Sequence, residues 1–148
     1  MSTATNRNFT RNQLSTDYDF SKTFRFANSY IKGEFINDTG AEVTLKIGTV
    51  LGRKASDASL KVLKFDAADG SQFPVGVCAE EVVVAIAGAV PDLYVCNSGD
   101  INLSSIILPA GTTLDSVISD KILRDRIVSD SKGIRLVPVT QNTSFNNF

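Results

Sequence analysis

Short apolar runs, separated by turn residues, dominate the middle of the chain. From about residue 31 to about residue 108, this pattern predicts a series of β-strands. The predicted strands cover residues 43–47, 60–65, 75–78, 82–86, 93–96 and 101–107. The predicted turns cover residues 37–40, 69–71, 91–92 and 97–100, where Asn, Asp, Ser, Gly and Pro gather.

The stretch from Lys64 to Val84 shows how single residues define the ends of strands. Gly70 follows Asp69 in a predicted turn, because glycine adopts positive φ angles without steric cost. Pro74 has no N–H to donate to a neighbouring strand, so we expect it at the start or the edge of a strand. The stretch is therefore predicted to be a strand, a turn and a strand.

One short helix is predicted near residues 113–130, because apolar residues recur there at steps of three, four or five. These residues are Leu114, Val117, Ile118, Ile122 and Ile127. Thr112 or Thr113 is expected to cap the start of the helix, and Lys132-Gly133 to mark its end. A strand over residues 134–139 and a polar tail over residues 140–148 are expected to follow.

The first 30 residues are polar but carry aromatic side chains, which disordered segments rarely do. Phe24 and Phe26 are two residues apart, so an extended backbone would place both rings on one face. Two interpretations stay open: an arm that packs on its own domain, or an arm that becomes ordered on a partner. We expect an N-terminal arm (1–30), a β domain (31–139) and a C-terminal tail (140–148).

The composition fits one globular domain, since 148 residues with 43% hydrophobic content can bury a core. A net charge of -1 gives no electrostatic reason to expect nucleic acid or an anionic membrane as a partner. No segment approaches the ~20 apolar residues of a membrane span. The polar N-terminus lacks the apolar core of a secretory signal, so we expect synthesis in a cytoplasm.

The two cysteines, Cys78 and Cys96, both lie in apolar, strand-like runs. A reducing compartment disfavours a disulfide, so both are expected to be free and buried. Without histidine, two cysteines need carboxylates or a second chain to form a structural zinc site. We expect no metal site.

The sequence offers few candidate catalytic residues, and we expect no enzymatic activity. The chain has no histidine, which is the most frequent general base and the usual partner of a serine or cysteine nucleophile. Glu80 and Glu81 would point to opposite faces of a strand, so they would not share a site. No glycine-rich phosphate-binding sequence and no calcium loop is present. We expect no catalytic residue and no cofactor.

The order of motifs over about residues 43–139 resembles the lambda-type phage head decoration proteins, also called capsid cement proteins. The resembling pieces are VLKFD (62–66), DGS (69–71), VGV (75–77), LYV (93–95), SGDIN (98–102), Pro109 and GIRLV (133–137). The family has the same succession of a D-G turn, a V-G-[IV] strand, an S-G turn before a strand, a helix and an I-x-[LIV]-V ending.

The resemblance implies a mainly β (β-rich α+β) domain, with a compact sheet or barrel, one short helix and an extended N-terminal arm. It implies homotrimers on the threefold and quasi-threefold axes of an expanded capsid, at the outer surface of the virion. There the trimer would clamp the major capsid protein against the pressure of packaged DNA, with no nucleic acid or membrane as partner. The arm would add a strand to the capsid protein. The candidate capsid-binding residues are Phe20, Phe24, Arg25, Phe26 and Tyr30.

Two other functions are compatible with the sequence. A head-fibre base or a tail component would also combine a β-rich domain with a polar arm. An unrelated enzyme or small-ligand module would instead be recognised by a tight ligand, or by turnover that depends on an Asp or Glu residue.

Overall fold

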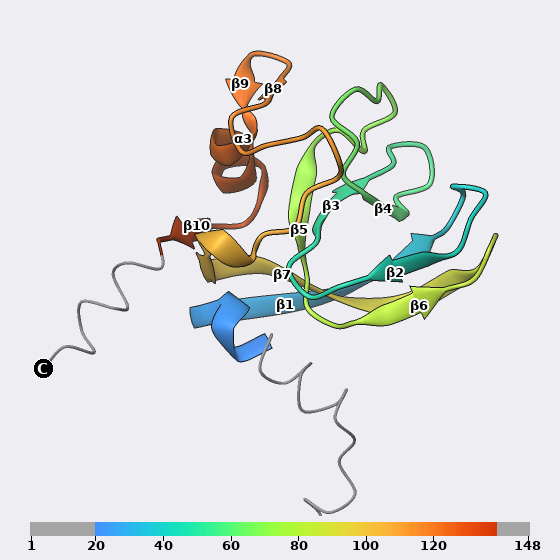
Figure 1. Ribbon diagram of the computed structural model, residues 1–148, viewed down its shortest axis with the longest axis horizontal. Helices are drawn as coiled ribbons and strands as arrows, with labels where there is room; N and C mark the ends of the chain where they lie inside the picture. The colour runs from blue at the N-terminus through green and yellow to red at the C-terminus, as the bar shows by residue number, and fades with distance from the viewer. Residues whose placement is uncertain (1–19, 139–148) are drawn as a thin grey trace, which may run out of the picture.

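The chain is mainly β, and five of its strands close into a barrel (Figure 1). The computed structural model describes residues 20–138. The strands are β1 (Phe24–Ile36), β2 (Val43–Leu45), β3 (Val50–Arg53), β4 (Leu60–Val62), β5 (Pro74–Cys78), β6 (Val82–Val84), β7 (Ala89–Asn102), β8 (Val117–Ile118), β9 (Lys121–Ile122) and β10 (Ile134–Val137). Residues 20–23 are helical, η1 spans Leu103–Ser105 and α3 spans Leu123–Asp130.

The barrel has the strand order β1-β4-β3-β5-β7, and it closes where β7 pairs with β1. The antiparallel β1–β7 ladder is the longest in the molecule and runs from Phe24↔Ile101 to Ile36↔Ala89. The β1–β4 seam is much shorter, with one registered pair, Phe35↔Leu60. Strand β10 extends the sheet beyond β7 in parallel, while β2–β6 and β8–β9 form two small separate sheets.

Two apolar clusters lie on opposite faces of the barrel sheet, because successive residues of a strand point to opposite sides. The first fills the barrel with Phe35, Leu45, Leu51, Leu60, Cys78, Val84, Leu93 and Val95. The second lies under α3 and contains Phe24, Ile47, Val50, Leu63, Val77, Ala79, Cys96, Ile101, Ile118, Leu123, Ile127 and Ile134. Neighbours such as Val50 and Leu51 therefore belong to different clusters.

Gly76 allows β5 to lie close to β7. A Cβ at this position would come within 2.5 Å of Val95 Cγ1 and 2.7 Å of the Cys96 carbonyl oxygen. No larger side chain fits without moving the ladder, which explains the glycine of the V-G-V motif. Pro74 begins β5, as predicted, where its missing N–H interrupts no ladder.

An irregularity interrupts β1 near its start, where the register with β7 shifts between Phe24 and Phe26 and again before Ser29. Ala27 has a φ of 55°, in the left-handed region that residues other than glycine seldom adopt. The side-chain amide of Asn28 donates to the Asp100 carbonyl at 3.1 Å and so links the irregular segment to β7. The bulge is therefore a fixed part of the ladder.

The expected mainly β fold, with a barrel and one short helix after residue 113, is confirmed. Two predicted turns are wrong, because residues 91–92 and 97–100 lie inside β7. This strand pairs with β1 on one side and with β10 on the other, so its pairing overrides the turn-forming residues. The apolar pattern also does not predict β1 or the four-residue strand β3.

The helix is shorter than predicted and begins at Leu123 instead of near residue 113. Residues 117–122 form the β8–β9 hairpin, in which Ser119 has a φ of 58°. Neither Thr112 nor Thr113 caps the helix; the Thr113 hydroxyl instead accepts from the Asp115 N–H at 3.2 Å in a local turn. The apolar positions at 118, 123 and 127 are buried, but from two different elements.

The expected boundary between the arm and the domain falls inside a strand. Residue 30 lies within β1, so residues 24–30 belong to the β1–β7 ladder. Residues 1–19 of the expected arm and the expected tail (140–148) lie outside the described residues. Within residues 20–138, no helix has the length and apolar character needed to cross a bilayer.

Both cysteines are free and buried, as predicted. Cys78 and Cys96 lie on adjacent strands but belong to different clusters, so their side chains point to opposite faces of the sheet. Burial raises the pKa of the Cys78 thiol to about 11, so it stays protonated at neutral pH.

We expect Cys78→Ser to lower the free energy of unfolding by about 1–3 kcal/mol, because the more polar hydroxyl enters the apolar barrel interior. Chemical denaturation of the two proteins measures this difference. Reducing agent should leave the melting temperature of the wild type unchanged. A large fall on reduction would mean that the two thiols are bridged and that the side-chain directions are wrong.

Candidate interaction surface

Three of the five candidate residues form one aromatic cluster where the chain enters β1. The Phe20 ring centroid lies 4.8 Å from that of Phe24 and 5.9 Å from that of Tyr30. Phe24 meets Tyr30 edge to face at 5.8 Å, and Tyr30 stacks on Tyr94 of β7 at 5.3 Å. Such pairs add stability beyond the area that they bury. The cluster therefore fastens the start of β1 to the domain.

The other two candidates, Arg25 and Phe26, are exposed. Phe26 exposes 71% of its surface, whereas Phe24 exposes 7%. The expectation that Phe24 and Phe26 share a face is therefore wrong. The register shift between them, followed by the left-handed Ala27, breaks the two-residue alternation of a regular strand.

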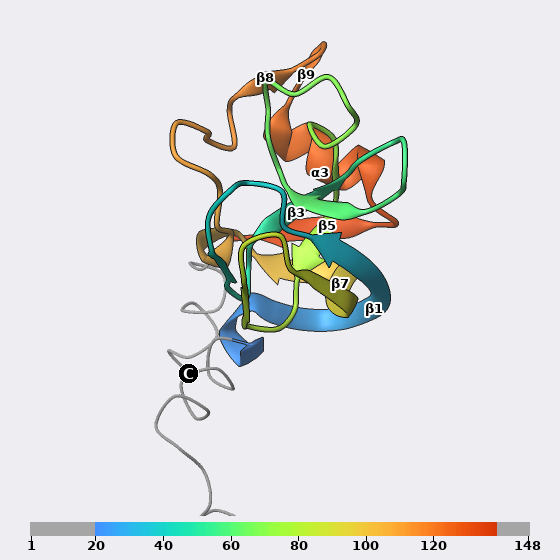
Figure 2. The same ribbon diagram turned by 90° about the vertical axis from the view of Figure 1, so that its right-hand side faces the viewer.

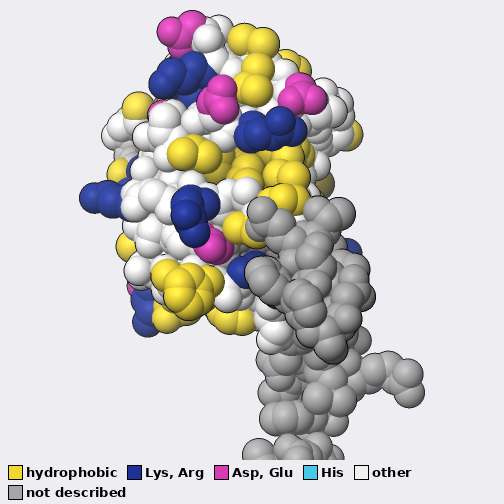
Figure 3. All heavy atoms as spheres, turned by 90° about the vertical axis from the view of Figure 1, so that its left-hand side faces the viewer, with side chains coloured by type: hydrophobic (Ala, Val, Ile, Leu, Met, Phe, Trp, Pro, Cys, Tyr) yellow, Lys and Arg dark blue, Asp and Glu magenta, His cyan; other side chains and the backbone are white. Residues whose placement is uncertain are grey.

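The surface around the start of β1 carries charged pairs beside apolar patches, and Figure 3 shows this side of the molecule. Arg135 of β10 donates from Nε to Asp100 Oδ1 at 2.8 Å and from Nη2 to Asp100 Oδ2 at 3.0 Å. This bidentate pair lowers the pKa of Asp100, mainly through the hydrogen bond to its carboxylate. Asp100 pairs with Phe26 across the ladder, so the exposed ring lies beside a fixed ion pair.

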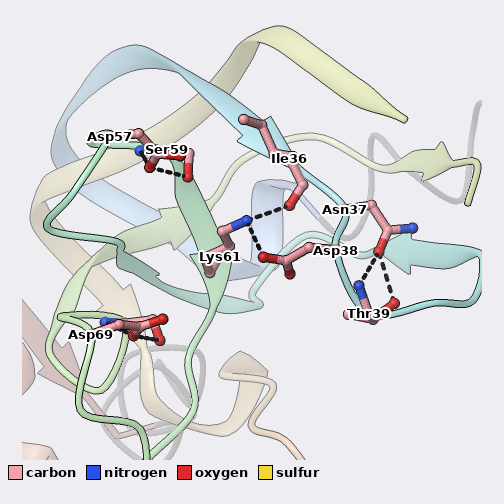
Figure 4. A network of polar contacts seen from close by, with 9 residues as sticks. Ile36, Asn37, Asp38, Thr39, Asp57, Ser59, Lys61 and Asp69 are labelled. Atoms are coloured by element: carbon pink, nitrogen blue, oxygen red, sulfur yellow. Dashed lines mark hydrogen bonds and ion pairs between the residues drawn. The ribbon is translucent and has the colours of Figure 1, made fainter. Parts of the chain in front are cut away.

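A hollow of about 540 Å³ lies at the short β1–β4 seam. At its wall, Lys61 is only 9% exposed, and its Nζ donates to the Ile36 carbonyl at 3.0 Å and to Asp38 Oδ2 at 2.8 Å (Figure 4). The hydrogen bond from Lys61 lowers the pKa of Asp38. The lysine thus ties the loop after β1 to β4, which closes the seam where the ladder ends.

Sequence reasoning missed a recurrent polar turn that shapes the loops. In four places within residues 20–138, an Asp or Asn side chain accepts from both the N–H and the hydroxyl of a Ser or Thr two residues later. The four acceptor residues are Asn37, Asp57, Asp69 and Asn102. The spacing Asx-x-Ser/Thr is the signal that could have identified them.

The candidate acidic side chains do not lie where the sequence places them. Glu80 and Glu81 lie between β5 and β6 and not within a strand. Among residues 20–138, no group of three or more His, Cys, Asp or Glu side chains is placed to hold a metal ion. The most distinctive candidate for an interaction is therefore an exposed side chain, the Phe26 ring at the start of β1.

The family model described as Bacteriophage lambda head decoration protein D matches residues 25–124. The chain belongs to this family. The match begins at the start of β1 and ends at the start of α3, so it covers the whole barrel. A search of curated proteins finds no match. Membership makes the chain a structural protein of a phage capsid, in agreement with the resemblance of its motifs.

Phe24 and Phe26 should respond differently to truncation. Phe24→Ala empties part of a buried cluster and should lower the free energy of unfolding by about 3 kcal/mol. Phe26→Ala removes an exposed ring and should change it by less than about 0.5 kcal/mol. Urea denaturation of both variants tests this contrast. Equal effects would mean that the bulge does not separate the two rings in solution.

Proposed function

We propose that this decoration protein, made in the host cytoplasm, binds the outer surface of an expanded phage capsid. It does so as homotrimers at the threefold and quasi-threefold positions, where it holds neighbouring copies of the major capsid protein together. The trimer thereby stabilises the head against the pressure of packaged DNA. Membership of the head decoration family is the single observation that carries this proposal.

The geometry at the start of β1 supports a contact with the capsid there. Residues 1–19 precede the aromatic cluster, so any contact that they make is anchored to the longest ladder of the fold. Arg25 and Phe26 are exposed next to this anchor. An extended arm that pairs with a capsid strand would gain main-chain hydrogen bonds, and an exposed ring beside it would supply specific fit. The proposed capsid-binding role of Phe20, Phe24 and Tyr30 becomes indirect, because they hold the base of the arm.

Purified protein mixed with expanded heads that lack it should bind as one trimer at each threefold and quasi-threefold position. Image reconstruction of the mixture, with counting of bound copies, measures this occupancy. Heads incubated without the protein are the control. Density confined to a single vertex or to the tail would contradict the proposal and favour a head-fibre base or a tail component.

Deletion of residues 1–19 should sharply reduce binding to heads while the melting temperature stays nearly the same, because the barrel core lies within residues 24–134. Phe26→Ala should weaken binding by more than about 1 kcal/mol, as expected for an exposed aromatic side chain that becomes buried against the capsid. Val128→Ala, which truncates another exposed apolar side chain, is the matched control. Full binding by the deletion variant would exclude the arm as a capsid contact.

A further inference from the structure

The loop between β6 and β7 exposes an unusual amount of apolar surface. Residues 82–90, which we name the apolar turn, have the sequence VVVAIAGAV and contain no polar side chain. Ile86 is 64% exposed and Val83 is 57% exposed, while Val84 is buried. Turns at protein surfaces are normally polar, and contiguous exposed apolar residues mark interaction sites.

The apolar turn is held rigidly. The Asn37 side-chain amide is buried and donates to the carbonyls of Val84 at 3.2 Å and Ala85 at 3.0 Å, and the Asn37 N–H donates to the Gly88 carbonyl at 2.9 Å. Ala87 has a φ of 57°, a conformation that costs free energy in a residue with a Cβ. A rigid, strained turn that presents an isoleucine is preorganised for binding, since little ordering remains to be done on contact.

The surroundings of the apolar turn are acidic. The two segments that form this end of the barrel, residues 33–43 and 84–93, contain no lysine or arginine. Their acidic residues are Glu34, Asp38, Glu42 and Asp92. Within residues 20–138, Asp38 is the member of this set that has an ion pair, with Lys61. The other carboxylates leave this end with a net negative charge.

Two of these carboxylates lie on neighbouring stretches of β1 and β7, where the register shifts. Glu34 lies between the registered pairs Gly33↔Leu93 and Phe35↔Val90, so it faces the stretch that contains Asp92. Both side chains are exposed. Like charges in this arrangement are destabilising in the free protein, and a basic partner would relieve the repulsion.

We propose that the apolar turn docks into an apolar socket that is rimmed by lysine or arginine on the major capsid protein, with Ile86 as the anchor. This inference rests on the proposed function and adds a second contact to it. A second copy in a twofold contact is the poorer occupant, because its acidic rim would face the same rim on its neighbour. The ladder places the turn beyond Ile36↔Ala89, at the end opposite Phe24↔Ile101 (Figures 1 and 2).

The two ends of the β1–β7 ladder lie far apart along the strands. The 13 residues of β1 span about 40 Å measured along the strand. Figure 2 looks onto the end where the loop between β6 and β7 lies beside the loop between β1 and β2. One subunit with contacts at both ends can bridge two capsid subunits, whereas one contact alone can only attach it.

The test compares Ile86→Ser with Val117→Ser in binding to expanded heads that lack the protein. Val117 is 61% exposed on the β8–β9 hairpin, so its variant is a matched control for loss of an exposed apolar side chain. We expect Ile86→Ser to bind at least tenfold more weakly and Val117→Ser to bind like the wild type. The affinity of the wild type should fall as salt rises, and Glu34→Gln with Asp92→Asn should reduce this dependence.

Wild-type affinity in Ile86→Ser would overturn the inference and leave the proposed function intact. A change in the oligomeric state of free Ile86→Ser, measured by light scattering, would also overturn it, because the turn would then contact a second copy. Wild-type protein that fails to bind heads would contradict the proposed function itself, and the inference with it.

Discussion

The antiparallel ladder between β1 and β7 is the constraint on which the rest of the structure depends. These two long strands close the barrel, and the edge of β7 that faces away from β1 pairs with both β5 and β10. The opposite closure, between β1 and β4, has a single registered pair and relies on the Lys61–Asp38 ion pair to hold the loop. Both proposed capsid contacts are attached to the ends of this ladder.

The two ends differ in how they present apolar groups. At the start of β1, a bulge turns Phe26 outward while Phe24 stays in the core. At the far end, Asn37 holds a turn that exposes Ile86. Each segment contains an alanine with a positive φ, Ala27 and Ala87, and Ala58 and Ser119 adopt the same conformation elsewhere in the fold.

The sequence predicts the strands whose apolar residues alternate or run together, and it predicts the buried cysteines. It fails where pairing overrides local preference: residues 97–100 look like a turn, but β1 and β10 pair with this stretch on both sides, and the positive φ of Gly99 (103°) falls at an irregularity within the strand. It also fails on Phe24 and Phe26, because a two-residue spacing indicates a shared face only in a regular strand.

The family could be recognised from the order of turns and strands, since these follow the barrel path. The exposed turn could not, because an apolar run such as residues 82–90 normally indicates burial.

The central claim is that the capsid contacts both ends of the β1–β7 ladder. Amide hydrogen exchange on the free protein and on the protein bound to expanded heads tests this claim most directly. Binding should slow exchange at residues 25–29 and at residues 84–88, and leave the β8–β9 hairpin unchanged. Protection at only one of these segments, or mainly at the hairpin, would contradict the account.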